Sequence, residues 1–115
     1  MNIKQLSHDL SVTSQISVQD IAGIKAANFR AIICNRPDGE IFGQAKFRDI
    51  EAAAKGAGFE ILHQPVTPGR ISAGDVETFA VALTELPKPV LAFCASGNRS
   101  EALWTRAQAR GLVSS

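Results

Sequence analysis

The chain has 115 residues, 45% of them hydrophobic and 20% charged, which is the size and composition of one globular domain spanning residues 1–115. A formal net charge of +1 excludes the strongly basic surface that binding to nucleic acid or to an anionic membrane requires. The apolar runs are too short to span a bilayer, and the first residues lack the apolar stretch of a signal peptide. We therefore expect a cytoplasmic protein.

In the cytoplasm both cysteines should be reduced, and two cysteines cannot form a disulfide scaffold. His8 and His63 stand alone, and no group of cysteines and histidines has the spacing of metal ligands. The sequence therefore predicts neither a metal site nor a bound cofactor.

Short apolar runs alternate along the chain with stretches of helical spacing. Strands are predicted at residues 10–13, at 31–34, within 59–66 and at 90–93. The second and the last of these runs are continuously apolar, which is typical of strands covered on both faces. Helices are predicted at residues 17–27, around 47–54, from 72 to the prolines at 87 and 89, and at 100–108. Ser17 and Ser72, each followed three residues later by Asp, supply capping signals at two helix starts.

Strands separated by helices predict an α/β fold, with a mostly parallel sheet, right-handed crossovers and helices on both faces. In such a sheet, functional side chains gather beyond the carboxyl ends of the strands. Cys94 directly follows the strand at 90–93, and Cys34 ends the strand at 31–34. The loop 36–40 comes after Cys34. We therefore expect a site at this edge of the sheet.

The loop after the last strand carries the clearest chemical signal. It consists of Cys94, Ala95, Ser96, Gly97, Asn98, Arg99 and Ser100. Gly97 permits backbone angles that a side chain would forbid, and small residues let successive N–H groups turn inward as an anion nest. The start of the following helix and the guanidinium of Arg99 add positive charge.

These groups should favour the thiolate of Cys94, since comparable settings bring a cysteine pKa to roughly 3.5–7.5. Cys94 and Arg99 are therefore the predicted catalytic residues, and residues 95–100 are the predicted binding site for a substrate anion. A buried structural cysteine in a strand-to-helix turn is the alternative.

The second cysteine and the loop after it are interpreted differently. Cys34 is predicted to be a core residue, with a resolving thiol for Cys94 as the alternative. Arg36, Asp38 and Glu40 are interpreted as partners in a local turn network. An accessory role at the site is the alternative for Arg36 and Asp38, because their loop should open on the same sheet edge.

Two family resemblances meet in this chain. The loop from Cys94 to Ser100 resembles the active-site loop of single-domain rhodaneses, C-R-S-G-x-R-S, which implies a sulfurtransferase with a persulfide on Cys94. Nearly the whole chain resembles the phosphatase-like domain of beta-lactamase hydrolase-like proteins, the DUF442 family. The matching stretches are residues 10–17, 36–40 and 89–94 with the loop that follows. This second resemblance implies a single domain with the fold of dual-specificity protein tyrosine phosphatases.

The chain departs from the phosphatase pattern in three respects. Four residues separate Cys94 from Arg99 where tyrosine phosphatases have five, so we expect a smaller ring of amides for the phosphate oxygens. Phe93 replaces the His that precedes the cysteine, and residues 65–69, where the leaving-group acid is expected, contain no carboxylate. Losing a general acid typically costs about 10²–10⁴-fold in rate. Asp38 is the nearby carboxylate that we nominate as a substitute.

Sulfur transfer needs neither a phosphate-sized cradle nor a leaving-group acid. From the sequence we therefore expect first a cysteine-dependent sulfurtransferase, with a small-molecule sulfane-sulfur donor and a thiol acceptor as partners. The second interpretation is a phosphatase that hydrolyses a phosphate ester through a phosphocysteine intermediate. The third is a non-catalytic anion-binding domain. We expect neither nucleic acid nor a membrane as a partner.

Overall fold

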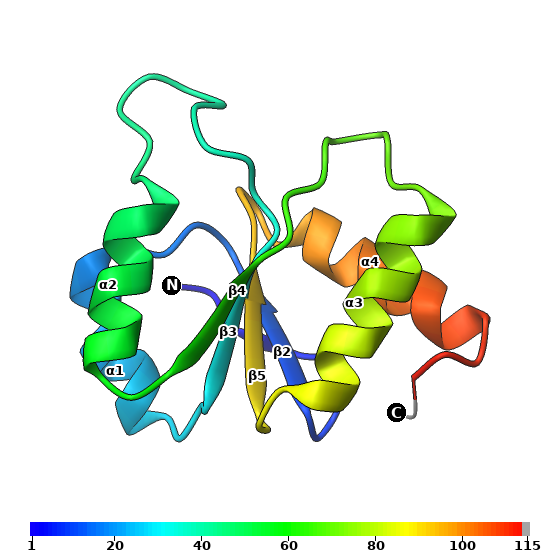
Figure 1. Cartoon of the computed structure of the whole chain (residues 1–115), viewed down its shortest axis with the longest axis horizontal. Coiled ribbons are helices and arrows are strands. Elements are labelled where there is room, and N and C mark those ends of the chain that lie inside the picture. The colour runs from blue at the N-terminus through cyan, green and yellow to red at the C-terminus, as the bar shows by residue number, and fades with distance from the viewer. Residues whose placement is uncertain (114–115) are drawn as a thin grey trace.

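A five-stranded sheet forms the middle layer of the molecule (Figure 1), and the computed structural model describes residues 1–113 of the chain. The strands are β1 (Lys4–Gln5), β2 (Leu10–Thr13), β3 (Ala31–Cys34), β4 (Glu60–His63) and β5 (Val90–Phe93). Their order across the sheet is β1-β2-β5-β3-β4. All neighbours pair in parallel except β1, which runs antiparallel to β2. The predicted mostly parallel α/β sheet is confirmed.

Helices cover both faces of the sheet (Figure 1). The short 3-10 helix η1 (Val18–Asp20), α1 (Ile21–Ala26) and α2 (Phe47–Gly56) lie on one face. The longer helices α3 (Ala73–Glu85) and α4 (Asn98–Ala109) pack together on the other face. This three-layer arrangement follows from strands whose two faces are both apolar and must both be covered.

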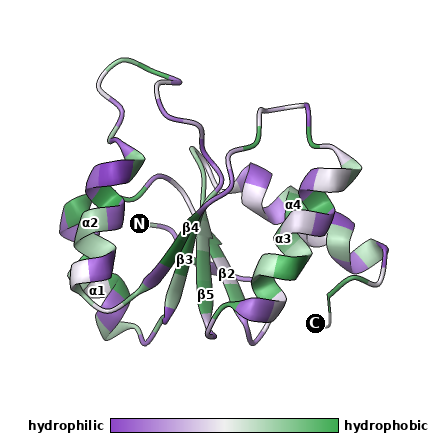
Figure 2. Cartoon of the chain, viewed as in Figure 1, coloured by the Kyte–Doolittle hydropathy of each residue, from purple (hydrophilic) through white to green (hydrophobic). Residues whose placement is uncertain are grey.

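The central strands β3 and β5 divide their side chains between two hydrophobic cores. Ile32 and Leu91 point toward α1 and α2, whereas Ile33 and Ala92 point toward α3 and α4. This alternation is the period-two geometry of a strand. Figure 2 shows hydrophobic residues concentrated along β3 and β5. The two continuously apolar runs are therefore buried on both faces of the sheet, as predicted.

Two details differ from the sequence prediction. Strand β1 was not predicted, because two exposed residues give no periodic signal, and its formation depends on pairing with β2. Helix α4 begins at Asn98, two residues earlier than predicted, because Gly97 acts as its N-cap with a φ of 96°. The earlier start brings Arg99 and Ser100 into the first helical turn.

The topology places the predicted site at one edge of the sheet. β5 lies between β2 and β3, so Cys94 leaves the sheet at its centre. Cys34 at the end of β3 pairs in register with Phe93 at the end of β5. The loops after β3 and β4 extend beyond this same edge (Figure 1). The expected position of Cys94 at the carboxyl end of a central strand is confirmed.

Within residues 1–113, none of the helices has both the length and the apolar character needed to cross a membrane. The same residues contain no cluster of three or more histidine, cysteine, aspartate and glutamate side chains that could hold a metal ion.

Leu91 should be among the most costly core side chains to truncate, because it has no exposed surface in the central strand. We expect Leu91→Ala to lower the free energy of unfolding by about 2–5 kcal/mol. Val81→Ala on the exposed side of α3 is the control and should change it by less than about 0.5 kcal/mol. Urea denaturation measures both, and equal effects of the two substitutions would contradict the assigned core.

Candidate active site

The turn between β5 and α4 wraps around the sulfur of Cys94. Gly97 adopts a φ of 96°, which side-chain-bearing residues rarely adopt. A Cβ atom added at Gly97 would also lie 3.3 Å from the carbonyl oxygen of Thr13 at the end of β2. Glycine is thus required at this position for two reasons, its backbone angle and the close approach of β2.

Backbone amides of the turn converge on the sulfur. Burial raises the pKa of Cys94, but hydrogen bonds from the N–H groups of Ser100, Ser96, Arg99 and Gly97 lower it, and the net pKa lies below that of an ordinary thiol. The amide nitrogen of Gly97 lies 3.1 Å from the sulfur. The nest that the sequence predicts is thus present, and its physical effect is to favour the thiolate.

The other two loop residues have different contacts. The carbonyl oxygen of Ala95 accepts a hydrogen bond from the backbone of Gln15. The N–H of Asn98 donates to the hydroxyl of Ser96 at 3.3 Å. Both residues therefore shape the loop.

Arg99 is held by a carboxylate from a distant loop. Its Nη1 and Nη2 atoms donate to the two carboxylate oxygens of Glu40 at 2.7 and 2.8 Å. Nη1 also donates to the carbonyl oxygen of Val66 at 2.9 Å. The bond to Glu40 is the main cause of the raised pKa of Arg99, to which the charge of Cys94 and a hydrogen bond with Cys94 also contribute. The guanidinium is fixed in place and permanently charged.

The remaining edge of this guanidinium is available. Of the five N–H donors of an arginine, three are used by Glu40 and Val66. The two that remain, Nε and the second hydrogen of Nη2, belong to the edge that binds oxyanions side-on.

Arg36 and Glu40 form the ion pair expected within their turn, with Nε of Arg36 2.8 Å from the carboxylate. Glu40 therefore joins two arginines, and these bonds, above all the one to Arg99, lower its pKa to about 2. Asp38 is not part of this group: its carboxylate accepts the N–H of Phe47 at the start of α2. Glu40 is thus the carboxylate that reaches the Cys94 loop, and the nomination of Asp38 as the acid stays a prediction.

Cys34 lies in the core beneath α2, as predicted. Burial raises the pKa of its thiol to about 12, and the S–H donates to the carbonyl oxygen of Arg36 at 3.4 Å, which favours the protonated thiol. It therefore stays protonated at neutral pH. Its alternative role as a resolving thiol for Cys94 stays a prediction.

Sequence reasoning missed one buried polar pair behind the loop. The hydroxyl of Ser100 donates to the side-chain oxygen of Asn35 at 2.8 Å, and Asn35 in turn donates to the carbonyl oxygen of Gln64 at 3.0 Å. Asn35 and Ser100 both have no exposed surface. This pair fixes the start of α4 against β3 and β4, and no motif in the sequence marks it.

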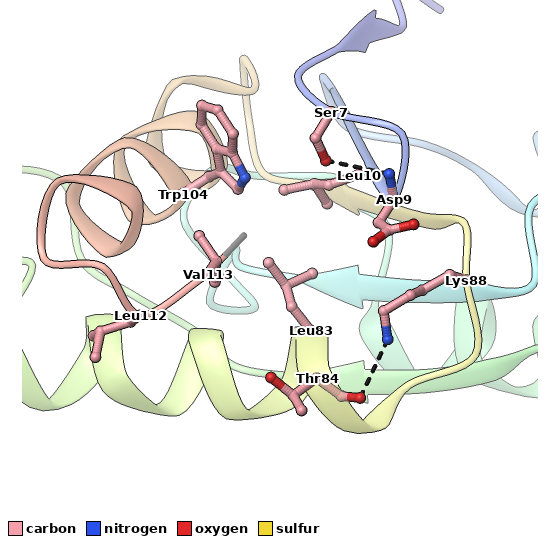
Figure 3. Close-up of a pocket in the computed structure, with 9 residues that line it drawn as sticks. All are labelled: Ser7, Asp9, Leu10, Leu83, Thr84, Lys88, Trp104, Leu112 and Val113. Atoms are coloured by element: carbon pink, nitrogen blue, oxygen red, sulfur yellow. Dashed lines mark hydrogen bonds between the residues drawn. The ribbon is translucent and has the colours of Figure 1, made fainter. Parts of the chain in front are cut away.

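A cavity of about 220 Å³ lies at the opposite edge of the sheet. Figure 3 shows it between Trp104 of α4, Leu83 of α3 and Leu10 at the start of β2. Asp9 and Lys88 contribute its charged groups. Because Leu10 begins the strand whose other end lies beside the Cys94 loop, this cavity is separate from the thiolate site.

Comparison with known proteins identifies the family. The family model described as "Beta-lactamase hydrolase-like protein, phosphatase-like domain" matches residues 2–111. The chain belongs to this family. A beta-lactamase hydrolase-like protein of Agrobacterium fabrum is 30% identical over 109 residues, which make up 95% of this chain and 25% of that protein. The phosphatase-like domain described here thus spans about a quarter of the length of the curated relatives it matches.

Solved structures of phosphatase-like proteins share this fold. A candidate phosphatase from Neisseria meningitidis Z2491 is 38% identical with a TM-score of 0.86, over 93% of this chain and 78% of that one. TpbA from P. aeruginosa, solved in complex with phosphotyrosine, has a TM-score of 0.73 over 93% of this chain and 62% of its own. At 18% identity, TpbA shows the shared fold alone.

These matches contradict the expectation of a sulfurtransferase, which is wrong. The physical error lay in the weight given to the spacing of Cys94 and Arg99. Despite one residue fewer, the amide nitrogen of Gly97 lies 3.1 Å from the sulfur, backbone hydrogen bonds of the loop lower the pKa of Cys94, and Arg99 keeps N–H donors that Glu40 and Val66 do not use. The shorter loop is therefore still able to bind an anion.

The two cysteines should titrate far apart, because amides stabilise one thiolate and burial suppresses the other. In Cys34→Ala, the ultraviolet absorbance of the Cys94 thiolate should appear below the pKa of an ordinary thiol. In Cys94→Ala, the thiolate of Cys34 should form only near pH 12. Coinciding titrations of the two variants would contradict the assigned amide cradle.

Glu40 should make stability depend on pH in the acid range. Because its folded-state pKa is depressed from 4.5 to about 2, its contribution is present above pH 4.5 and is lost as the pH falls toward 2. Glu40→Gln should therefore lower the melting temperature at neutral pH, and the difference from wild type should shrink below pH 4.5. Glu60→Gln on β4 is the matched control, with no such trend. A difference that stays constant with pH would contradict the ion pairs.

Proposed function

We propose that this chain is a cysteine-dependent phosphatase that hydrolyses a phosphate monoester through a phosphocysteine on Cys94. The observation that carries the proposal is the geometry of the loop: the amide nitrogen of Gly97 lies 3.1 Å from the sulfur of Cys94, and two hydrogen bonds from Glu40 hold Arg99 of the same loop in place. The family supports it, since its name and its structural relatives point to phosphatases. Substrates and partners of the longer relatives are not transferred by this similarity.

The reaction runs in two displacements at phosphorus. The thiolate of Cys94 attacks the phosphorus atom, the S–P bond forms, and the ester oxygen departs with the bonding electrons. Water then attacks the phosphocysteine, which releases inorganic phosphate and restores the thiolate. In both steps, the loop amides and Arg99 bind the non-bridging oxygens and stabilise their charge in the transition state.

Protonation of the leaving group is the weak point of this site. Glu40 is ionised at neutral pH because two arginines hold its pKa near 2, so it is a poor proton donor. Asp38, the nominated acid, accepts an N–H bond from Phe47. An ester whose leaving group needs no proton, such as a phenolate, should therefore react best.

Glu40 instead supports the site by fixing Arg99. A bidentate carboxylate holds the guanidinium at one edge and leaves Nε and one hydrogen of Nη2 as donors for an anion. The bond from Nη1 to the carbonyl oxygen of Val66 adds a third fixed contact. Such preorganisation favours binding of the charge that develops on the transferred phosphoryl group.

The decisive test is hydrolysis of an aryl phosphate compared with an alkyl phosphate. We expect turnover of p-nitrophenyl phosphate, its loss in Cys94→Ser, and an aryl preference of about 10²–10⁴-fold. Arg99→Lys keeps the charge without the planar fork and should recover only part of the activity that Arg99→Ala loses. Phosphate release, followed over time, measures all of these rates.

Three outcomes would count against the proposal or its parts. Hydrolysis that survives Cys94→Ser would exclude the phosphocysteine. Equal rates for aryl and alkyl esters, combined with loss of only the alkyl rate in Asp38→Asn, would make Asp38 the acid. A reactive Cys94 without any turnover would favour the non-catalytic anion-binding domain. Arg48→Gln, at an exposed position of α2, controls for the change in net charge.

A further inference from the structure

Arg36 is a charged side chain that the fold keeps almost entirely from water. It belongs to the loop after β3, and its side chain is only 8% exposed. Its Nε donates to Glu40 at 2.8 Å and its Nη1 donates to the side-chain oxygen of Gln15 at 3.1 Å. Burying a guanidinium is costly unless it is paired, so this placement requires an explanation.

The two partners of Arg36 stand on opposite sides of the Cys94 loop. Gln15 follows β2 and donates its backbone N–H to the carbonyl oxygen of Ala95, the first residue after the cysteine. Glu40 binds Arg99 at the other end of the loop. Through Gln15 and Glu40, Arg36 therefore connects the two ends of the Cys94 loop.

Charge balance favours a role in binding anions. Glu40 is ionised and is shared by two guanidinium groups, so these three side chains carry a net charge of +1. Without Arg36, the pair of Arg99 and Glu40 would be neutral. With the Cys94 thiolate included, Arg99 and Glu40 would present a net charge of −1 to an approaching ester anion, and Arg36 brings this total to zero, which reduces the repulsion.

Arg36 also has donors to offer. Of its five N–H groups, Glu40 and Gln15 use two. Within residues 1–113, the buried side-chain nitrogen and oxygen atoms without a partner are Thr13 Oγ1 and Gln64 Oε1. Among residues 1–113, Nη2 of Arg36 forms no hydrogen bond with the protein. It is not one of the buried atoms without a partner, so it is accessible to solvent.

We propose that Arg36 is a second anion-binding residue of this site, and that the substrate is a phosphate ester with a further anionic group beside the scissile phosphate. The further group is a second phosphate or a carboxylate, because the oxygens of either group can accept a hydrogen bond from Nη2 of Arg36. This inference rests on the proposed phosphatase function and specifies its substrate class. Arg99 and the loop amides bind the scissile phosphate, and Arg36 binds its neighbour.

The test compares anions of the two kinds on the same protein. Cys94→Ser is titrated calorimetrically with inorganic phosphate, with pyrophosphate and with a carboxyphenyl phosphate, and phenyl phosphate serves as the reference for the last. Adding Arg36→Gln should lower the affinity for pyrophosphate or for carboxyphenyl phosphate by about tenfold or more, as expected for loss of a charge-assisted hydrogen bond. The affinities for inorganic phosphate and for phenyl phosphate should fall by less than about threefold.

Two further variants separate recognition from general effects. Arg36→Lys keeps the charge and should recover part of the lost affinity, whereas Arg48→Gln removes an exposed charge and should leave the discrimination intact. The melting temperature and the Cys94 thiolate absorbance of Arg36→Gln in the otherwise unchanged chain verify that the fold and the loop persist. Of pyrophosphate and carboxyphenyl phosphate, the probe that loses more affinity identifies the second group as phosphate or carboxylate.

An equal loss of affinity for all four ligands would overturn the inference, because Arg36 would then act only through Glu40. Unchanged affinity for pyrophosphate and carboxyphenyl phosphate would overturn it as well. Failure of the proposed function has a different signature: the wild-type chain would hydrolyse neither phenyl nor carboxyphenyl phosphate, while the titrations would still measure the contribution of Arg36 to binding.

Discussion

The convergence of backbone amides on one sulfur is the interaction on which the site depends. It requires a central strand that ends at Cys94 and a helix that begins four residues later. It also requires the left-handed conformation of Gly97, which lets the chain reverse against the carbonyl oxygen of Thr13. Burial alone raises a thiol pKa, as Cys34 shows, so the amides account for the opposite direction at Cys94.

A single carboxylate connects the rest of the site to that loop. Glu40 lies between Arg36 and Arg99, and its ionisation is maintained by both. The same contacts tie the loop after β3 to the first turn of α4, which are separate elements of the fold. Structure and electrostatics are therefore coupled: a substitution at Glu40 changes the orientation of Arg99 as well as the local charge.

Sequence reasoning reached the fold and the position of Cys94 at the end of β5, because both depend on local signals. Continuous apolar runs marked β3 and β5, and small residues before Arg99 marked the turn. It did not find the contacts between distant segments. Glu40 and Arg99 are 59 positions apart, and Asn35 and Ser100 are 65 apart. Such pairs depend on how the crossovers set neighbouring strand ends side by side, which a single sequence does not encode locally.

The error about the reaction has a physical origin in the same distinction between local and distant contacts. A thiolate in a nest of amides is a general device, since it stabilises negative charge whatever electrophile approaches the sulfur. The loop at residues 94–100 therefore carries little information about the substrate. Selectivity must come from groups that the loop does not contain, namely those that handle the leaving group and those that bind its surroundings. Under the proposed function, Arg36 binds these surroundings, and Glu40, which donates no proton at neutral pH, positions Arg99; both reach the loop from the segment after β3.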